Sequence, residues 1–321
     1  MSKLMKIMFG LLFIVLIVVP FISNAYTVQV AITTITYSML GLAFAFSMKV
    51  GLPRMDIAAW WGVGGYTTAI LMKDGMSFWL TALIGGIIAV IVGGIVFSIA
   101  IPRGMMAFFI FCMVLSMAFY QVYGTVDFFG GWSGIVSVPS PTIGSFQFVS
   151  KQSLYYMGLG FLIVNGVVYY LFYRSKIGRA WNAIGSSLGL ARSLGIDVVR
   201  YRMANVLIGN FFIALAGSYF VAYYRAAVPA VFSFAAGLNV MVYLIIGGFT
   251  YSLSGPILGA LIATFLPEYL RVESQYQTIF TSAIVILILM FLPQGLLGLL
   301  DRKVRPWFIR QKWYVRLSGN A

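Results

Sequence analysis

Long apolar runs are the feature that most constrains how this chain can fold. A helix needs about 20 apolar residues to cross a hydrocarbon core, and the sequence contains about ten runs that approach this length. They lie near residues 7–22, 28–48, 57–72, 78–101, 105–124, 154–173, 203–224, 236–250, 255–270 and 276–298. Hydrophobic residues make up 61% of the chain and charged residues 9%, which excludes a soluble globular enzyme. We therefore expect an all-α polytopic membrane protein with about ten transmembrane helices.

The basic residues predict the orientation of the chain in the membrane. The 21 Lys and Arg exceed the 7 Asp and Glu by 14 charges, which in a soluble protein would suggest a nucleic acid as partner. With both termini in the cytoplasm, 17 of these bases fall inside and 4 outside, as the positive-inside rule requires. We expect a transmembrane domain over 1–300 and a basic cytoplasmic tail over 301–321, with 174–202 as a cytoplasmic loop and 125–153 as an extracytoplasmic loop. The charge excess is therefore a topology signal, and we expect the lipid bilayer rather than nucleic acid as partner.

The first apolar run has two interpretations. Lys3 and Lys6 precede it, and Ser23-Asn24-Ala25 after it could form the cleavage site of a signal peptide. The run over 7–22 is longer than the apolar region of a typical signal peptide, so we expect it to be retained as the first span.

Several kinds of chemistry are excluded by missing residue types. The chain has no His and one Cys, which excludes a His-based acid/base site, a Cys/His zinc site and an intramolecular disulfide. Cys112 lies in an apolar run, where a thiol usually serves as a small packing residue. The sequence contains no G-x-x-x-x-G-K-[ST] loop, so energy from ATP would have to come from another polypeptide. We expect a protein that is not an enzyme and that holds no cofactor of its own.

Two of the apolar runs, 57–72 and 236–250, are short and are interrupted by glycines. Each belongs to a pattern of helix, Gly-rich break and second apolar segment, once in each half of the chain. The two patterns cover 28–48, 51–56 and 57–72, and then 236–250, 251–254 and 255–270. Paired interruptions in corresponding places indicate a transport pathway. The alternative is that the glycines allow neighbouring helices to pack closely, and the sequence leaves both open.

The first break contains an acid and a base, Arg54 and Asp56. Ionisable groups at membrane depth are costly, so a functional role is the default hypothesis, and the non-helical backbone that Pro53 favours would let the two form a salt bridge. A zwitterionic solute could be passed along such a pair. The alternative is that both are solvated at the cytoplasmic end of a helix. The candidate pathway residues are Arg54, Asp56, Trp60, Gly62, Gly64, Asn210, Asn239, Gly247 and Gly248.

The two asparagines among these candidates also have two interpretations. If their helices pack as expected, Asn210 and Asn239 face the interior and offer neutral hydrogen-bonding groups to a solute. They could instead bond neighbouring helices.

The loop 174–202 has helical periodicity in two pieces. Apolar residues are spaced at i, i+3 and i+4 in each piece, which predicts two short amphipathic helices with a glycine break between them. They are Ala180, Ala183 and Ile184 in the first, and Leu190, Ala191 and Leu194 in the second. Such helices suit a groove on a partner protein, or they lie on the membrane and are held by anionic lipid through the six bases of the loop.

The same loop carries a motif. It reads Gly178-Arg179-Ala180, then Ala183-Ile184, then Ala191 and Leu194-Gly195-Ile196, and Tyr201-Arg202 follows. This arrangement resembles the coupling loop of the permease subunits of bacterial ABC importers for branched-chain amino acids. That family also includes permeases for urea and short amides.

Four other stretches agree with this resemblance. They are Ala58-Ala59-Trp60-Trp61-Gly62 with Gly64 and Tyr66, Gly130-Gly131 with Ser133-Gly134-Ile135, Ser233-Phe234 with Gly247-Gly248 and Gly255-Pro256, and Pro293-Gln294-Gly295-Leu296-Leu297-Gly298. Each motif alone is weakly specific. Together they follow the order that the family has across residues 41–298, which supports the resemblance.

The resemblance implies a transport subunit without chemistry of its own. Two permease chains, usually two different paralogues, would form the pathway between them in the bacterial cytoplasmic (inner) membrane. Two cytoplasmic ATP-binding subunits, which hold the ATP and Mg, would drive the pair, and an extracytoplasmic solute-binding protein would deliver the solute. The coupling loop would lie in a groove on the ATPase. Its residues are Gly178, Arg179, Ala180, Ala183, Ile184, Ala191, Leu194 and Gly195.

The sequence departs from the family pattern at three places. Ile57 stands where these permeases commonly have a His, Asn239 where they commonly have a Glu, and Leu188-Gly189-Leu190 where the coupling loop commonly has an acid. Branched-chain amino acids therefore stay an open assignment beside similar small polar solutes. The alternative function is an ATP-independent secondary transporter or channel. An ion-coupled carrier usually needs acids or His on its path, and Asp56 is the one candidate.

Overall fold

The computed structural model describes residues 24–248 and 254–270, together with the single residues 286, 290 and 295. The predicted segment over 7–22, nearly all of the one over 276–298, and the predicted tail over 301–321 lie outside the described residues. Within those ranges the chain is mostly helical, as expected.

The long helices follow the predicted apolar runs closely. The helices are α2 (Ala25–Met48), α3 (Ile57–Lys73), α4 (Phe78–Ala100), α5 (Met105–Thr125), α6 (Lys151–Arg174), α7 (Lys176–Ser186), α8 (Leu188–Ser193), α9 (Val198–Tyr224), α10 (Phe234–Gly247) and α11 (Ser254–Leu270). Short 3-10 turns are η1 (Ile101–Arg103), η2 (Asp127–Phe129), η3 (Gly131–Ser133) and η4 (Pro229–Phe232).

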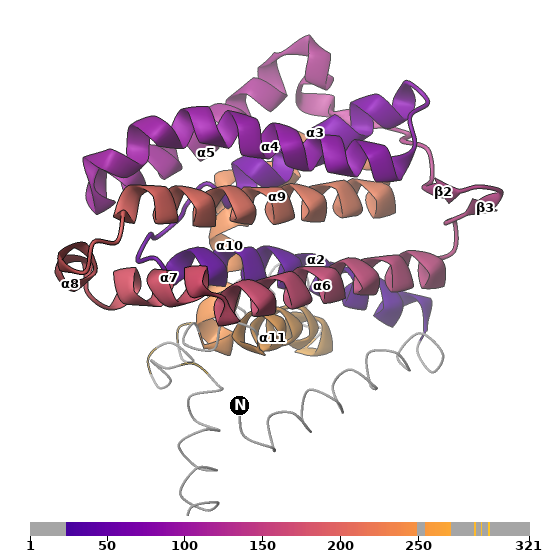
Figure 1. Ribbon diagram of the computed structural model, residues 1–321. Helices are drawn as coiled ribbons and strands as arrows, with labels where there is room; N and C mark the ends of the chain where they lie inside the picture. Colours follow the sequence, from indigo (N-terminus) through magenta and orange to yellow (C-terminus); the bar gives the residue numbers. More distant parts are fainter. Residues whose placement is uncertain (1–23, 249–253, 271–285, 287–289, 291–294, 296–321) are drawn as a thin grey trace, which may run out of the picture.

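In the described part of the chain, four strands of two residues each add to the expected all-α architecture. β1 (Ile135–Val136) pairs antiparallel with β4 (Ala226–Ala227), and β2 (Thr142–Ile143) pairs with β3 (Phe146–Gln147) in a hairpin that projects at the end of the bundle (Figure 1). The β1–β4 pair ties the loop over 125–153 to the end of α9. A composition dominated by apolar helices gives no signal for strands this short.

Helix α9 lies in the middle of the bundle (Figure 1). It packs against α3 and α4 on one side and against α2 on the other, and α6 and α11 pack on α2 in turn. α10 packs chiefly against α11. The interior is formed by large side chains that include Trp60, Trp61 and Phe44, all of them fully or almost fully buried.

Five helices are long and apolar enough to cross a membrane, judged by length and composition, among the residues that the structure describes. They are Tyr26–Met48, Phe78–Arg103, Met105–Thr125, Lys151–Arg174 and Val198–Tyr224. The expected count of about ten spans is not confirmed. Three of the predicted segments form helices of 17, 14 and 17 residues, α3, α10 and α11, which are short for a full crossing. The segments over 7–22 and 276–298 are the remaining two.

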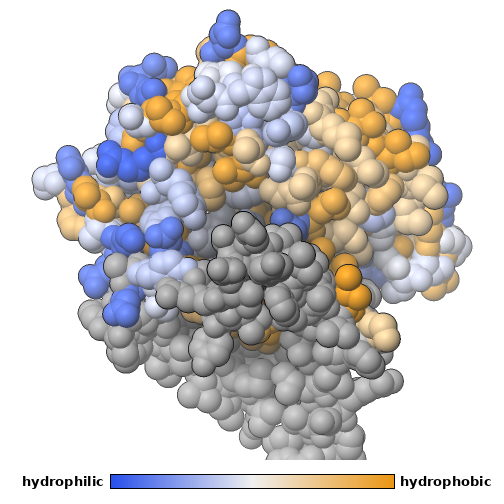
Figure 2. Space-filling view, turned by 180° about the vertical axis from the view of Figure 1, so that it is seen from behind, coloured by the Kyte–Doolittle hydropathy of each residue, from blue (hydrophilic) through white to orange (hydrophobic). Residues whose placement is uncertain are grey.

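A stripe of exposed aliphatic side chains runs along α4. Leu83, Ile87, Ile91, Ile95 and Ile99 recur every four residues, so they lie on one face of the helix, and each is at least 50% exposed. Figure 2 shows hydrophobic residues over much of the described surface, with hydrophilic residues gathered near its edges. Contiguous apolar surface of this kind indicates contact with lipid or with another membrane chain.

The glycines of α3 allow it to approach α9 closely. A Cβ on Gly64 would overlap the backbone of Ala214, and a Cβ on Gly217 would overlap the carbonyl of Trp61. Small residues at such crossings let helix backbones meet, which is the usual packing device inside membranes. Close packing is therefore observed for this Gly-rich segment, and its role in a pathway stays a prediction.

This contact predicts that Gly64→Ala destabilises the protein, because the added methyl group has no space between α3 and α9. Overpacking of this kind costs about 1–3 kcal/mol. The measurement is the apparent melting temperature of the purified protein in detergent. Gly94→Ala in α4 is the matched control, since a Cβ there meets nothing within 4 Å. Equal melting temperatures for the two variants would contradict the packing assignment.

Candidate functional site

The connector between α2 and α3, residues 49–56, brings an acid and a base together. Arg54 and Asp56 form a bidentate salt bridge, with Nε 2.9 Å from Oδ1 and Nη2 2.5 Å from Oδ2. Both side chains are fully buried. The salt bridge that the non-helical backbone was expected to allow is therefore present. The alternative, two solvated residues at a helix end, is wrong, because helices α3, α4 and α9 cover the pair.

Every N–H group of the Arg54 guanidinium has an acceptor. Besides Asp56, Nη1 donates to the Val206 carbonyl at 3.3 Å and makes a longer contact of 3.5 Å with Ser47 Oγ, while Nη2 donates to Asn210 Oδ1 at 2.5 Å. A guanidinium has five N–H donors, and these bonds account for all five. A buried charge is tolerated when it is paired and fully hydrogen-bonded, and that condition is met here.

Two further side chains complete this cluster. Trp60 Nε1, in the first turn of α3, donates to Asp56 Oδ2 at 2.5 Å. Asn210 Nδ2 donates to the Ala89 carbonyl of α4 at 3.4 Å. We call Arg54, Asp56, Trp60 and Asn210 the buried hub. It joins the connector to α3, α4 and α9, so Asn210 bonds neighbouring helices, which was the second of its two interpretations.

The other predicted pathway residues lie in two different places. Gly62 and Gly64 are on α3, where Gly62 faces the ring of Tyr123. Asn239 is exposed on α10, Gly247 is buried near the end of that helix, and Gly248 ends it with a φ of 105°. The structure thus divides the predicted set between the region around the hub and α10.

Two functional contacts were missed by the sequence analysis. Arg202 Nε donates to the Val50 carbonyl at 3.2 Å, and Asn205 Nδ2 donates to the Phe46 carbonyl at 3.3 Å. Both side chains lie on α9: Asn205 bonds a carbonyl in the last turn of α2, and Arg202 bonds one in the connector that follows it. From the sequence, Arg202 was named only among the bases of the loop 174–202 and in the coupling-loop motif, and Asn205 was not named.

The loop over 174–202 forms two short helices, as predicted. The hydroxyl of Ser175 caps α7 by accepting from the Gly178 amide at 3.2 Å, and that of Ser187 caps α8 by accepting from the Leu190 amide at 3.3 Å. Serine hydroxyls favour helix starts for this reason. The break between the helices is thus set by Ser187.

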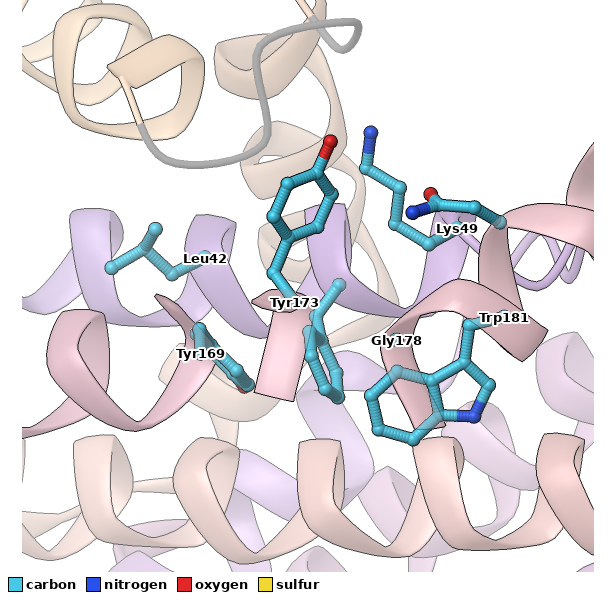
Figure 3. A pocket seen from close by; sticks show the side chains of 8 residues that line it. Leu42, Lys49, Tyr169, Tyr173, Gly178 and Trp181 are labelled. Carbon is cyan, nitrogen blue, oxygen red and sulfur yellow. The ribbon is translucent and has the colours of Figure 1, made fainter. Parts of the chain in front are cut away.

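Helix α7 sits on the ends of α2 and α6 (Figure 3). The Trp181 ring lies 4.8 Å from the Phe46 ring, and its Nε1 donates to the Tyr201 carbonyl at 2.8 Å. The remaining space at this seat is a cavity of ≈ 20 Å³, enough for one water and too small for a solute. Partial burial lowers the pKa of the Lys49 ammonium, whose Nζ lies 5.7 Å from the centre of the Tyr173 ring. Helix α7 is therefore tightly packed against the ends of α2 and α6, and we call this contact the joint.

The predicted coupling-loop residues divide between this joint and the surface. Gly178, Ile184 and Ala191 are buried, and Ala180 and Ala183 are partly buried. The exposed members are Arg179, Leu194 and Gly195. Leu190 of α8 and Leu194, which directly follows that helix, are 61% and 67% exposed, so this part of the expected apolar face has no cover within the described chain.

A larger cavity of ≈ 280 Å³ lies at the opposite end of the bundle, beside the loop over 125–153. Lys151 and Arg225 contribute cationic groups to its lining, and Tyr223 and Tyr224 contribute phenols. The Nε of Arg225 donates to the Val138 carbonyl at 3.0 Å, which holds this side chain against the loop. Among the described residues, no group of three His, Cys, Asp or Glu side chains is placed to hold a metal ion.

The hub predicts a specific pattern of stability changes. Asp56→Ala leaves a buried guanidinium without its counter-charge, so we expect it to cost about 3–5 kcal/mol. Arg54→Met with Asp56→Ala removes both charges and should cost clearly less than the sum of the two single variants. The measurement is thermal unfolding of the purified variants in detergent. Additive losses would show that the two residues do not act as a pair.

Comparison with known proteins places the chain in a family. Residues 26–292 match the family model for the branched-chain amino acid transport system permease component. The high-affinity branched-chain amino acid transport system permease protein LivM of Escherichia coli is 25% identical over 311 residues, which cover 87% of this chain and 71% of the relative. LivH of the same organism is 31% identical over 128 residues, covering 39% of this chain and 40% of the relative.

A transporter of another named solute is also similar. The D-allose transport system permease protein AlsC of Escherichia coli is 26% identical over 287 residues, which cover 83% of this chain and 82% of the relative. No solved structure matches the chain. The family model covers most of the sequence and includes the connector, the hub and the α7–α8 loop, so this protein belongs to the family of branched-chain amino acid transport system permease components.

Proposed function

We propose that the protein is the transmembrane permease subunit of a bacterial ABC importer in the cytoplasmic (inner) membrane. It forms half of the translocation pathway, and separate ATP-binding subunits supply the energy. The observation that carries this proposal is the family match over residues 26–292. The five apolar helices and the exposed stripe on α4 support a multi-pass membrane protein.

The proposed solutes are amino acids of the branched-chain type or similar small polar molecules. LivM and LivH are named for branched-chain amino acids, and AlsC is named for D-allose, so relatives of similar identity serve chemically different solutes. Asn239 is exposed on α10 and offers a neutral amide, whereas the charges of the hub are fully bonded inside the chain. We propose that the face of α10 that carries the exposed Asn239 lines the pathway, with Gly247 and Gly248 at the end of the same helix, and that the hub supports it.

The proposed ATPase contact is the surface of α7 and α8. Leu190 and Leu194 are 61% and 67% exposed, and the exposed Arg192 lies between them in the sequence, which gives a small apolar surface next to a positive charge. Such a surface fits a groove on a folded partner. The remaining partners are a second permease chain, usually a paralogue, and a solute-binding protein on the opposite side.

The ATPase contact predicts that Leu190→Asp with Leu194→Asp abolishes binding to the cognate ATPase, because two carboxylates would be buried at the interface. The measurement is co-isolation of the tagged permease with the ATPase, followed by ATP-driven solute uptake in proteoliposomes. Both should fall to background.

Val136→Asp is the matched control, since Val136 is 52% exposed and lies at the opposite end of the bundle in the loop over 125–153. It should leave co-isolation with the ATPase unchanged. Solute uptake by a native chain that binds no ATPase would refute the proposal and favour a transporter that works without ATP.

A further inference from the structure

We propose that α7 acts on the transport helices through the connector 49–56, with Gly185 and Arg54 as positioning residues for coupling. This inference rests on the proposed function, in which α7 and α8 receive the motion of the ATPase. It adds the route by which that motion reaches the membrane-spanning core.

The first contact on this route joins α7 to the connector backbone. Gly185, near the end of α7, lies against the carbonyl of Lys49, and a Cβ at position 185 would overlap that oxygen. Gly51 lies beside it with a φ of 67°, a conformation that glycine adopts without strain. Backbone touches backbone here, so the contact has no flexible side chain to absorb a displacement.

The second contact fixes the connector to α9. Arg202 Nε bonds the Val50 carbonyl at 3.2 Å, and the Nη2 of the same side chain would lie 3.8 Å from a Cβ on Gly51. Val50, which Arg202 of α9 bonds, thus lies between Lys49 and Gly51, the two residues beside Gly185 of α7. A displacement of residues 49–51 by α7 would therefore be transmitted to α9 through Arg202.

The third contact is the buried hub, which begins three residues after Gly51. Arg54 bonds the Val206 carbonyl and Asn210 of α9, and Asp56 bonds Trp60 of α3. Separating the connector from these helices would break these bonds and leave buried donors of Arg54 and Trp60 without acceptors, which is more costly than moving the assembly as a unit. The hub therefore makes α3 and α9 follow the connector.

The other contacts of α7 reach α2, α6 and, through the bond from Trp181 Nε1 to the Tyr201 carbonyl, the first turn of α9. Trp181 packs on Phe46 and Phe172, and Gly178 lies against the carbonyls of Phe172 and Tyr173 at the end of α6. None of the candidate pathway residues lies on α6. These contacts hold α7 in place, whereas Gly185 is the contact that meets the connector.

The test uses the complete complex of permease chains, ATPases and binding protein in proteoliposomes, and it measures the number of solute molecules taken up per ATP hydrolysed. Gly185→Ala lifts α7 off the connector, so we expect this ratio to fall by about tenfold while ATP hydrolysis and assembly persist. Gly166→Ala in α6, where a Cβ meets nothing within 4 Å, is the matched control and should keep the native ratio.

Arg54→Lys tests the other end of the route without changing the surface of α7. An ammonium keeps the charge opposite Asp56, but its three donors cannot replace the five of the guanidinium, so the bonds to α9 are lost. We expect a similar fall in the transport-to-ATP ratio. Because both changes break one route, the double variant should transport no worse than the more affected single variant.

A native ratio in either variant, or losses that multiply in the double variant, overturns this inference. If Gly185→Ala prevents assembly, the transport-to-ATP ratio of Arg54→Lys decides between the outcomes, because Arg54 is fully buried and its substitution leaves the ATPase-facing surface unchanged. A native complex that binds no ATPase would instead refute the proposed function, so the two failures are distinguishable.

Discussion

The structure depends on the burial of one guanidinium group. Placing an ion in a low-dielectric interior costs several kcal/mol unless its partners are close and correctly oriented. Arg54 meets this condition only because Asp56, Asn210 and the Val206 carbonyl converge on it. The start of α3 and the middle of α9 must therefore keep fixed positions relative to the connector, and the packing of α3 on α9 through Gly64 and Gly217 is consistent with that requirement.

This constraint bears on the end of the bundle where α7 packs. Two α9 side chains hold this end: Asn205 bonds the last turn of α2, and Arg202 bonds the connector after it, and α7 packs against the same place. A helix that rests on this joint is connected to the core through the connector rather than through the flexible ends of surface side chains. The exposed Leu190 and Leu194 lie on the surface where the proposed ATPase would contact α7 and α8. The proposed function requires such a connection, because an importer subunit without its own ATP site must receive the motion of a separate ATPase.

Much of the helical architecture could be predicted from the sequence, because apolar runs and glycine breaks determine where helices begin and end in a membrane. The runs over 78–101 and 105–124 became α4 and α5 almost residue for residue, and the short α3 and α10 were indicated by their glycines. The salt bridge between Arg54 and Asp56 was one of two alternatives that the sequence left open. Their bonds to Val206 and Asn210 join residues 152 and 156 positions apart, and helical periodicity carries no information on such distant partners.

The central claim is that α7, the connector and α3 move as one unit, and it can be tested by the distance between spin labels on Ser186→Cys and Asp74→Cys. Both positions are exposed, one at the end of α7 and the other at the far end of α3, and native Cys112 is buried. Pulsed electron resonance on the complete complex would measure this distance with and without ATP. The account predicts the same distance distribution in both states, and a shift between them would contradict it.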